Sequence, residues 1–167
     1  RLKPYTNILP KPLIPIGDKT ITERIMDEFI RNGCREFYMI INYKKDFIKS
    51  YFSEAISDFT IHYIEEKEYY GTGGGLSLCK GLFNGTFIMT NCDVVINDSY
   101  YKYFEEHKRK KNIVTIITVK KDMQLPYGII TLDENGYVVA MEEKPKQTFY
   151  TNTGFYIIEP EFLNLIP

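Results

Sequence analysis

Two cations near the start of the chain stand in a segment rich in proline. Arg1 and Lys11 fall within the first fifteen residues, RLKPYTNILPKPLIP. Each proline fixes φ and removes an N–H donor, so we expect a stiff, extended loop with neither a helix nor a strand of its own. Such a loop holds two cations at a fixed separation, which suits a polyphosphate. An ordinary proline-rich arm is the alternative.

One carboxylate stands directly after an apolar run. Residues 86–90 (TFIMT) read as a buried strand, and Asn91, Cys92 and Asp93 follow it. Ligands of open α/β sheets bind outside the carboxyl ends of the strands, where Asp93 could hold Mg²⁺ against phosphate oxygens. The alternative is a turn aspartate that bonds its own backbone.

A polar, glycine-dense turn, residues 65–75, leads into a short apolar segment. Turns of this kind before helices are common, and only some of them cradle anions. The turn is therefore a candidate binding loop that needs support from its context.

The spacing of hydrophobic residues along the chain predicts the helices and strands that must position these residues. A capping-box pattern at residues 20–23 begins a helix that ends at Asn32 and Gly33. Further helices are expected at 46–56, 76–80 and 100–111, with a short one starting at Pro160. Strands are expected at 36–42, 59–64, 86–90, 113–119 and 155–158, and a hairpin at 128–132 and 137–143 around the turn 133–136.

Apolar strands that alternate with amphipathic helices predict an α/β layer fold with a mostly parallel sheet and a mixed edge contributed by the hairpin. The length of 167 residues suits one domain, and we see no repeat or linker, so residues 1–167 are expected to form a single domain. Hydrophobic residues make up 44% and charged residues 26%, as in soluble globular proteins.

Charge and cysteine content exclude several classes of function. The 21 basic and 22 acidic residues give a net charge of −1, which provides no general field for nucleic acid or a membrane surface. Cys34, Cys79 and Cys92 lack CxxC spacing and are expected to be reduced thiols. His62 and His107 have no partner at metal-ligand spacing. No apolar run reaches transmembrane length and no signal peptide is visible, so we expect a cytoplasmic protein.

The motifs together resemble the signature of the sugar-1-phosphate nucleotidyltransferases, also called nucleoside-diphosphate-sugar pyrophosphorylases. In that family a strand and a glycine-rich turn precede Arg-Leu-x-Pro-x-Thr and then Pro-Lys-Pro-Leu. Here Arg1-Leu2, Pro4, Thr6 and residues 10–13 match. The resemblance implies a Rossmann-like three-layer fold and, weakly, the mannose-1-phosphate guanylyltransferase branch. The family carries a Gly-Asp motif after this strand. Asp93 matches its aspartate, and Cys92 stands in place of its glycine.

The family's Leu-Gly-Thr-Ala-Gly turn matches Gly71, Thr72 and Gly74, while Tyr70 and Gly73 are substitutions. By that match these residues bind the nucleotide, because backbone without side chains lets a flat base approach closely. Glu66 falls where the family places a base-reading side chain. A carboxylate accepts hydrogen bonds, which suits the N1–H and N2–H₂ donors of guanine and favours GTP. An exposed surface glutamate is the alternative.

Three further matches imply a sugar-phosphate site. Tyr127-Gly128 matches the family's Tyr-Gly, whose glycine lines the sugar pocket. In the Glu-Lys-Pro motif, Glu143 would accept from sugar hydroxyls and Lys144 would pair with the sugar phosphate. Asn152, in the match to Asn-Ala-Gly-Ile-Tyr, would contact the sugar. By composition alone, Glu143 and Lys144 are typical of a solvated strand end, and Asn152 is typical of a turn.

The resemblance implies attack of a sugar-1-phosphate oxygen on the α-phosphorus of a nucleoside triphosphate, which releases pyrophosphate. Arg1 would bind the β and γ phosphates, and Lys11 would bridge the attacking and α phosphates. Asp93 would hold Mg²⁺, and catalysis would rest on positioning and charge neutralisation. Such an enzyme would supply nucleotide sugars for polysaccharide or glycan synthesis.

Two departures from the family pattern concern activity. The family's first strand and glycine-rich turn are absent before Arg1, and its second metal-binding aspartate falls beyond Pro167. We therefore expect a fragment with little or no turnover, whose exposed sheet edge could pair with another copy.

Two other classes of function remain open. A nucleotide-sugar-binding regulatory domain would keep the fold without turnover, but it need not retain Arg1, Lys11, Asp93 and Lys144 together. A glycosyltransferase shares the layer architecture but usually shows Asp-x-Asp, and here Asn91 stands at the first carboxylate position.

Overall fold

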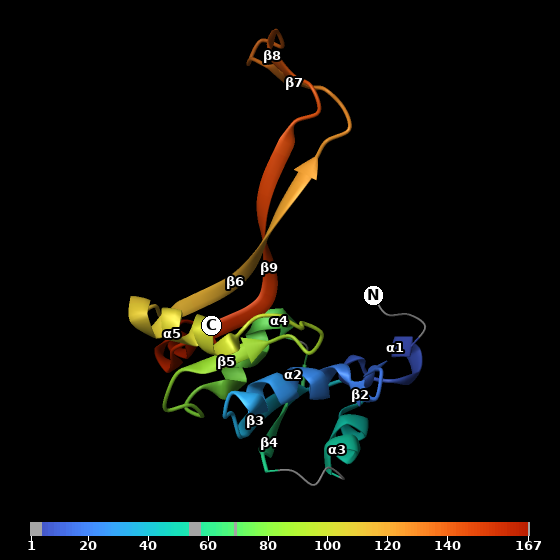
Figure 1. The fold of residues 1–167 in the computed structure, drawn as a ribbon, viewed down its shortest axis with the longest axis vertical. Helices are drawn as coiled ribbons and strands as arrows, with labels where there is room; N and C mark the ends of the chain where they lie inside the picture. Colours follow the sequence, from blue (N-terminus) through green and yellow to red (C-terminus); the bar gives the residue numbers. More distant parts are fainter. Residues whose placement is uncertain (1–4, 54–57, 69, 167) are drawn as a thin grey trace. The chain divides into compact units, whose positions relative to one another are not determined.

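The computed structural model describes residues 5–53, 58–68 and 70–166 (Figure 1). The chain forms two compact units. The body unit comprises residues 1–115 and 154–167, and the hairpin unit comprises residues 116–153. Strands β6 (Val114–Gln124) and β9 (Lys146–Ile158) pass from one unit into the other. Among the described residues, no helix has the length and apolar character needed to cross a membrane.

Helix α2 (Ile21–Arg31) begins with the predicted capping box. The N–H of Glu23 donates to Thr20 Oγ1 at 3.2 Å, and the N–H of Thr20 donates to Glu23 Oε2 at 2.7 Å. This exchange satisfies backbone donors that have no partner within the first helical turn. Ile25 and Met26 are buried on the inner face. The expected helix is therefore confirmed.

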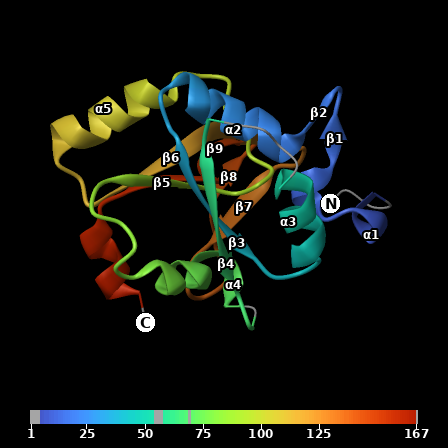
Figure 2. The ribbon, with the colours of Figure 1, turned by 90° about the horizontal axis from the view of Figure 1, so that it is seen from below.

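A parallel strand pair and a helix form one core of the body unit. Strands β3 (Glu36–Ile41) and β4 (Thr60–Glu65) pair over their whole length. Helix α3 (Lys45–Ser53) contributes Ile48 and Phe52, which pack with buried residues of α2 and β3. Figure 2 shows the course of these helices and strands. This βαβ arrangement is the one that the alternating pattern predicted.

A second, antiparallel group of strands forms the rest of the body core. Strand β5 (Phe87–Thr90) pairs antiparallel with the end of β9, and β9 lies between β5 and β6. The Phe155 ring of β9 is fully buried and stacks on Phe29 of α2, with ring centroids 6.0 Å apart. Tyr100, at the start of α5 (Tyr100–Lys110), completes the cluster. Helices α2 and α5 lie along the same side of the body unit (Figure 2).

The hairpin unit contains the predicted turn. Strands β7 (Ile129–Leu132) and β8 (Val138–Glu142) pair antiparallel. Asp133 Oδ1 accepts hydrogen bonds from the N–H groups of Asn135 and Tyr137, both at 2.9 Å. A carboxylate that bonds its own turn in this way fixes the hairpin register. The hairpin prediction is confirmed.

The proline-rich segment contains regular turns, which corrects the expectation of a loop without elements. It forms a helical turn α1 (Tyr5–Ile8), a 3₁₀ turn η1 (Lys11–Leu13) and a short pairing of β1 (Pro15–Ile16) with β2 (Lys19–Thr20). Pro12 is tolerated because it lies in the first turn of η1, where a backbone N–H needs no helical partner.

Several element boundaries also differ from expectation. The expected helix at 76–80 is a 3₁₀ helix, η2 (Gly75–Cys79), and the helix expected at Pro160 is also 3₁₀, η3 (Pro160–Leu165). The helix expected at 46–56 is α3, which begins at Lys45, and residues 54–56 of that expected helix lie outside the described residues. Strand β9 begins nine residues before the expected Phe155. Its first part is polar and pairs with β6, so an apolar run could not reveal it.

A polar cluster around Glu159 joins α5 and β6 to the residue before β5 (Thr86) and the residue after β9 (Glu159). The His107 side chain is fully buried, with Nε2 3.2 Å from Glu159 Oε1 and Nδ1 2.8 Å from Thr115 Oγ1. Thr86 Oγ1 donates to Glu159 Oε1 at 2.8 Å, and Lys108 Nζ lies 3.1 Å from the same oxygen. Both ring nitrogens of His107 thus have partners, so its burial leaves no polar atom unsatisfied.

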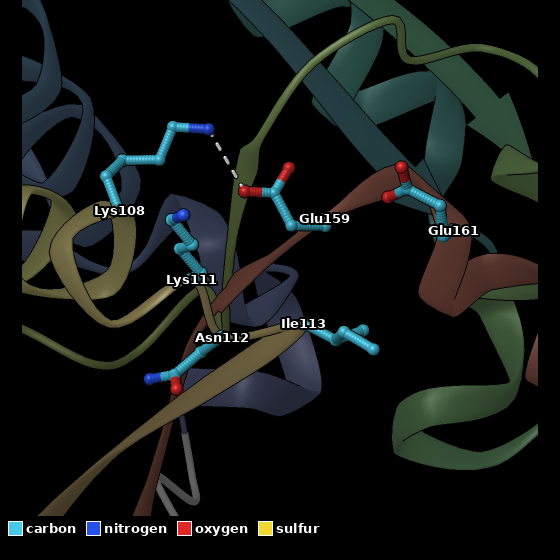
Figure 3. Close-up of a pocket in the computed structure, with 6 residues that line it drawn as sticks. All are labelled: Lys108, Lys111, Asn112, Ile113, Glu159 and Glu161. Atoms are coloured by element: carbon cyan, nitrogen blue, oxygen red, sulfur yellow. Dashed lines mark hydrogen bonds and ion pairs between the residues drawn. The ribbon is translucent and has the colours of Figure 1, made fainter.

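This cluster borders a pocket of about 470 Å³. Figure 3 shows the Lys108 amine directed toward Glu159, with Glu161 at the other side. Lys111, Asn112 and Ile113 complete the lining. None of the candidate site residues that the structure describes lines this pocket.

We predict that Glu159 makes stability fall in acid. Burial would raise the pKa of this carboxyl, but hydrogen bonds from Thr86, Lys108 and His107 together lower the pKa below its ordinary value of 4.5. The carboxylate therefore stabilises the fold above that value, and the contribution is lost as pH falls through the lower folded-state pKa. Glu159→Gln should lower the free energy of unfolding by about 1–3 kcal/mol at pH 7.

Urea denaturation from pH 7 to pH 3 tests this expectation. The loss caused by Glu159→Gln should shrink as the pH falls. Glu161→Gln is the matched control, because Glu161 lines the same pocket but is exposed. Equal losses in the two variants would contradict the prediction.

Candidate functional site

Lys11 and Asp93, predicted from separate motifs, form an ion pair through Lys11 Nζ and Asp93 Oδ2. Their side chains are 43% and 32% exposed, so the pair is accessible to a ligand. Two main-chain bonds fix the segment around Lys11: Leu13 N–H donates to Pro10 O at 2.9 Å, and Ile14 N–H donates to Lys11 O at 3.2 Å. The 3₁₀ turn therefore holds the base of the lysine, while its amine reaches Asp93.

Asp93 lies in a tight turn at the carboxyl end of β5. The N–H of Val94 donates to Asn91 O at 3.3 Å, which closes the turn over Cys92 and Asp93. The N–H of Asn91 donates to Gly154 O at 3.1 Å and extends the ladder between β5 and β9. Burial raises the pKa of the Cys92 thiol, and the Asp93 carboxylate raises it further. Cys92 is therefore a neutral thiol at pH 7.

The chemistry of this pair suits a metal–phosphate ligand. Mg²⁺ is typically held by one or two carboxylates together with phosphate oxygens and water. Within residues 5–53, 58–68 and 70–166, no group of three or more acidic, histidine or cysteine side chains could hold a metal ion. A single carboxylate at Asp93 fits an ion that takes its other ligands from a polyphosphate, and Lys11 fits the phosphate charge.

The glycine-rich turn needs glycine at specific positions. Gly71 opens α4 (Gly71–Gly74) with φ +84°, a conformation that other residues rarely adopt. A Cβ on Gly74 would lie 2.8 Å from the Cβ of Tyr70, which is too close. A Cβ on Gly73 would meet nothing within 4 Å. The substituted position Gly73 thus has space for a side chain and no positive φ to restrict the residue type.

Glu66 lies over this turn. Its Oε1 atom is 3.1 Å from the place of a Cβ on Gly75 and 3.4 Å from the N–H of Tyr70, a long hydrogen bond. The side chain is half-buried, so it is not the exposed surface glutamate of the alternative reading. The carboxylate supports the turn, and its assignment as a base-reading group stays a prediction.

In the hairpin unit, three of the predicted sugar-phosphate residues lie together. A Cβ on Gly128 would lie 2.9 Å from Glu143 Oε2, so the carboxylate of this exposed side chain lies directly against the glycine. Lys144 Nζ lies 3.7 Å from Glu143 Oε1. Lys144 also has φ +48° directly before Pro145, a strained conformation of the kind that clusters at functional sites.

Asn152 lies on β9, in the same unit. Its neighbours Thr151 and Thr153 donate their hydroxyl groups to Val119 O at 3.1 Å and Ile117 O at 2.7 Å. Both acceptors belong to β6, so β9 is anchored on each side of Asn152. Sequence reasoning did not identify these threonines, and their β-branched, alternating positions in residues 146–154 were the only signal.

The predicted residues thus fall into three described groups: Lys11 with Asp93, Glu66 with the glycine-rich turn, and Gly128 with Glu143 and Lys144. Thr72 lies within α4. Arg1 lies outside the described residues, and its role stays a prediction. Asn91 and Gly154 were not predicted as site residues, although the resemblance had included Gly154 in a motif.

Gly73 and Gly74 of α4 provide a matched test of the turn. Gly73→Ala should raise the free energy of unfolding by about 0.4–1 kcal/mol, because alanine fits and restricts the unfolded chain. Gly74→Ala should lower it by about 1–3 kcal/mol, because the methyl group collides with Tyr70. Denaturant titration of both variants measures the difference. Similar stabilities would show that the turn does not have this geometry.

Comparison with known proteins extends these findings. The family model described as nucleotidyl transferase matches residues 1–166. The chain is 29% identical over 99% of its length to the bifunctional protein GlmU of Methanococcus aeolicus, and it spans 39% of that protein. It is 30% identical over 98% of its length to the D-glycero-alpha-D-manno-heptose 1-phosphate guanylyltransferase of Campylobacter jejuni, and it covers 73% of that enzyme.

A solved structure supports the same relationship. HddC from Yersinia pseudotuberculosis complexed with GMP-PN superposes with a TM-score of 0.74 at 25% identity, over 100% of this chain and 75% of HddC. This similarity confirms the expected α/β nucleotidyltransferase fold. Among the described strands, the β3–β4 pair is parallel, whereas β1–β2, β5–β9 and β7–β8 are antiparallel and lie in separate sheets, so the expectation of one mostly parallel sheet does not describe these strands. Fold, motif order and a family match across nearly the whole length agree. The chain belongs to the nucleotidyl transferase family.

Proposed function

We propose that the protein transfers a nucleotidyl group from a nucleoside triphosphate to a sugar 1-phosphate and releases pyrophosphate. Family membership supports the reaction class, and relatives named for guanylyl and uridylyl transfer to sugar phosphates support the acceptor class. The observation that carries the proposal for this chain is the Lys11–Asp93 ion pair, which joins the two charged motifs. We also propose that residues 1–167 belong to a single nucleotidyltransferase domain.

The proposed mechanism depends on positioning and charge, and it needs no covalent protein nucleophile. Lys11 neutralises the attacking and α phosphates, and Arg1 neutralises the β and γ phosphates of the leaving pyrophosphate. Asp93 would hold Mg²⁺, which supplies charge neutralisation to the phosphate oxygens when it is bound. Lys144 holds the sugar phosphate.

The remaining residues give the substrates their orientation. Glu143 accepts hydrogen bonds from the sugar hydroxyl groups, and the Asn152 side chain contacts the sugar. Gly128, against which the Glu143 carboxylate lies, lines the sugar pocket. The turn formed by Gly71, Thr72 and Gly74 receives the base. The proposed reaction takes place in the cytoplasm, where the three free thiols stay reduced.

Substrate identity is tested by pyrophosphate release from the full-length protein with four nucleoside triphosphates, a panel of sugar 1-phosphates and Mg²⁺. We expect release with one preferred pair. Binding of nucleotide without release across the panel would instead favour a silent, regulatory nucleotide-sugar-binding domain.

Substitution of either member of the ion pair should remove most of the activity. Lys11→Ala and Asp93→Ala should each lower kcat by about a hundredfold or more, because each removes a charge placed at the reacting phosphates. Lys19→Ala is the matched control: Lys19 pairs with Asp27 at 2.7 Å, with side chains 44% and 38% exposed. Activity that survives in Lys11→Ala at the level of Lys19→Ala would contradict the proposal.

GTP is proposed as the preferred nucleotide, with Glu66 as the base-reading carboxylate. Glu66→Gln keeps an oxygen that can accept from the N–H of Tyr70 but removes the charge that suits the two guanine donors. The ratio of kcat/KM for GTP over UTP should fall by about tenfold. Glu68→Gln, an exposed neighbour, should leave the ratio unchanged. An unchanged ratio in Glu66→Gln would remove Glu66 from base recognition.

A further inference from the structure

Gly154 adopts a left-handed backbone conformation beside the turn that carries Asp93. Its φ is +84°, although it lies within strand β9. Its carbonyl oxygen accepts the N–H of Asn91 at 3.1 Å, and Asn91 O in turn accepts the N–H of Val94. Asn91 is therefore the residue through which β9 holds the turn of residues 91–94.

The missing side chain of Gly154 makes room for Asn91. A Cβ on Gly154 would lie 2.9 Å from Asn91 Cγ and 3.6 Å from Asn91 Cβ. Asparagine is short, so its amide group cannot withdraw far while its main chain stays bonded to β9. Any side chain at position 154 would push on the residue that anchors the turn.

The other glycines with positive φ show that the contact of position 154 with Asn91 is distinct from backbone strain. Gly33, Gly71, Gly81 and Gly136 also have positive φ, but a Cβ at each would meet nothing within 4 Å. At Gly17, the neighbouring atom is the far end of the flexible Arg24 side chain, which can move. Among the described glycines with positive φ, Gly154 alone faces a short side chain that is tied to a site residue.

We propose that Gly154 is a positioning residue that sets the turn of residues 91–94 and so places the Asp93 carboxylate opposite Lys11. The effect on catalysis rests on the proposed function. The effect on the position of the turn does not depend on that function. In Gly154→Ala the methyl group displaces Asn91, and the displacement passes to Cys92 and Asp93. The Lys11–Asp93 contact is then weakened although both residues are intact.

Cys92 provides a local reporter of this turn. It lies between Asn91 and Asp93 and is half-buried. Its labelling by a thiol reagent in the full-length protein, resolved from Cys34 and Cys79 by peptide mass spectrometry, measures how firmly the turn is held. Gly154→Ala should accelerate Cys92 labelling by at least about fivefold, with Cys34 labelling unchanged.

Two further variants identify the cause. Gly33→Ala introduces the same kind of backbone strain (φ +89°) without a contact, so it should not change Cys92 labelling. The double variant Asn91→Ala/Gly154→Ala removes the collision and should return the labelling rate to within about twofold of wild type. If Gly154→Ala does not fold, Asn91→Leu enlarges the facing side chain with the glycine in place and should accelerate labelling in the same direction.

Activity and metal binding provide the functional readouts. Gly154→Ala should lower the rate of pyrophosphate release by about tenfold and weaken the binding of Mn²⁺, measured by electron paramagnetic resonance, by a similar factor. A wild-type protein that releases no pyrophosphate would refute the proposed function and leave the inference about the turn standing. Unchanged Cys92 labelling in Gly154→Ala, or an equal change in Gly33→Ala, would overturn the inference itself.

Discussion

The antiparallel ladder between β5 and β9 is the interaction on which the body unit depends. It joins segments more than sixty residues apart and buries Phe155, Ile157 and Ile158 completely. Phe155 then packs on α2 and α5, so the two helices take their places from the same strand. Beyond the ladder, the bond from Asn91 to Gly154 continues the pairing into the turn that carries Asp93. Core and candidate site therefore share one register, and a slip in it would expose the core and move the carboxylate together.

Much of the local structure could be predicted because its causes lie close together in the sequence. The capping box of α2 needs only Thr20 and Glu23, and the hairpin needs only the Asp133 turn between two apolar runs. The first half of β9 could not be predicted, because its polar residues become a strand only by pairing with β6. The prediction for the proline-rich segment was wrong for a different reason. Proline is excluded from a helix interior, but it fits the first turn of a 3₁₀ helix.

The site was predictable as a set of residue types and much less as an arrangement. Lys11 and Asp93 could be named from their motifs, but their pairing depends on contacts between segments that the sequence does not connect. The same holds for the support that Glu66 gives to the glycine-rich turn. His107 offered no signal at all, because its partner Glu159 lies 52 positions further along the chain. Glycine motifs were more informative, because a residue without a Cβ permits a positive φ or a close approach of another group wherever its neighbours lie in the sequence.

The ion pair between Lys11 and Asp93 has a thermodynamic consequence for ligands of opposite charge. In the free protein the two groups neutralise each other, so neither an anion nor a cation meets a full, unopposed charge. The first ligand to bind must break the ion pair. The second ligand then binds a side chain whose charge is no longer neutralised. Linkage requires this benefit to be mutual, so a metal ion and a polyphosphate at such a pair would show positive heterotropic cooperativity. A phosphate or chloride ion that binds without a metal ion would gain much less binding free energy. The pair therefore disfavours the binding of simple ions.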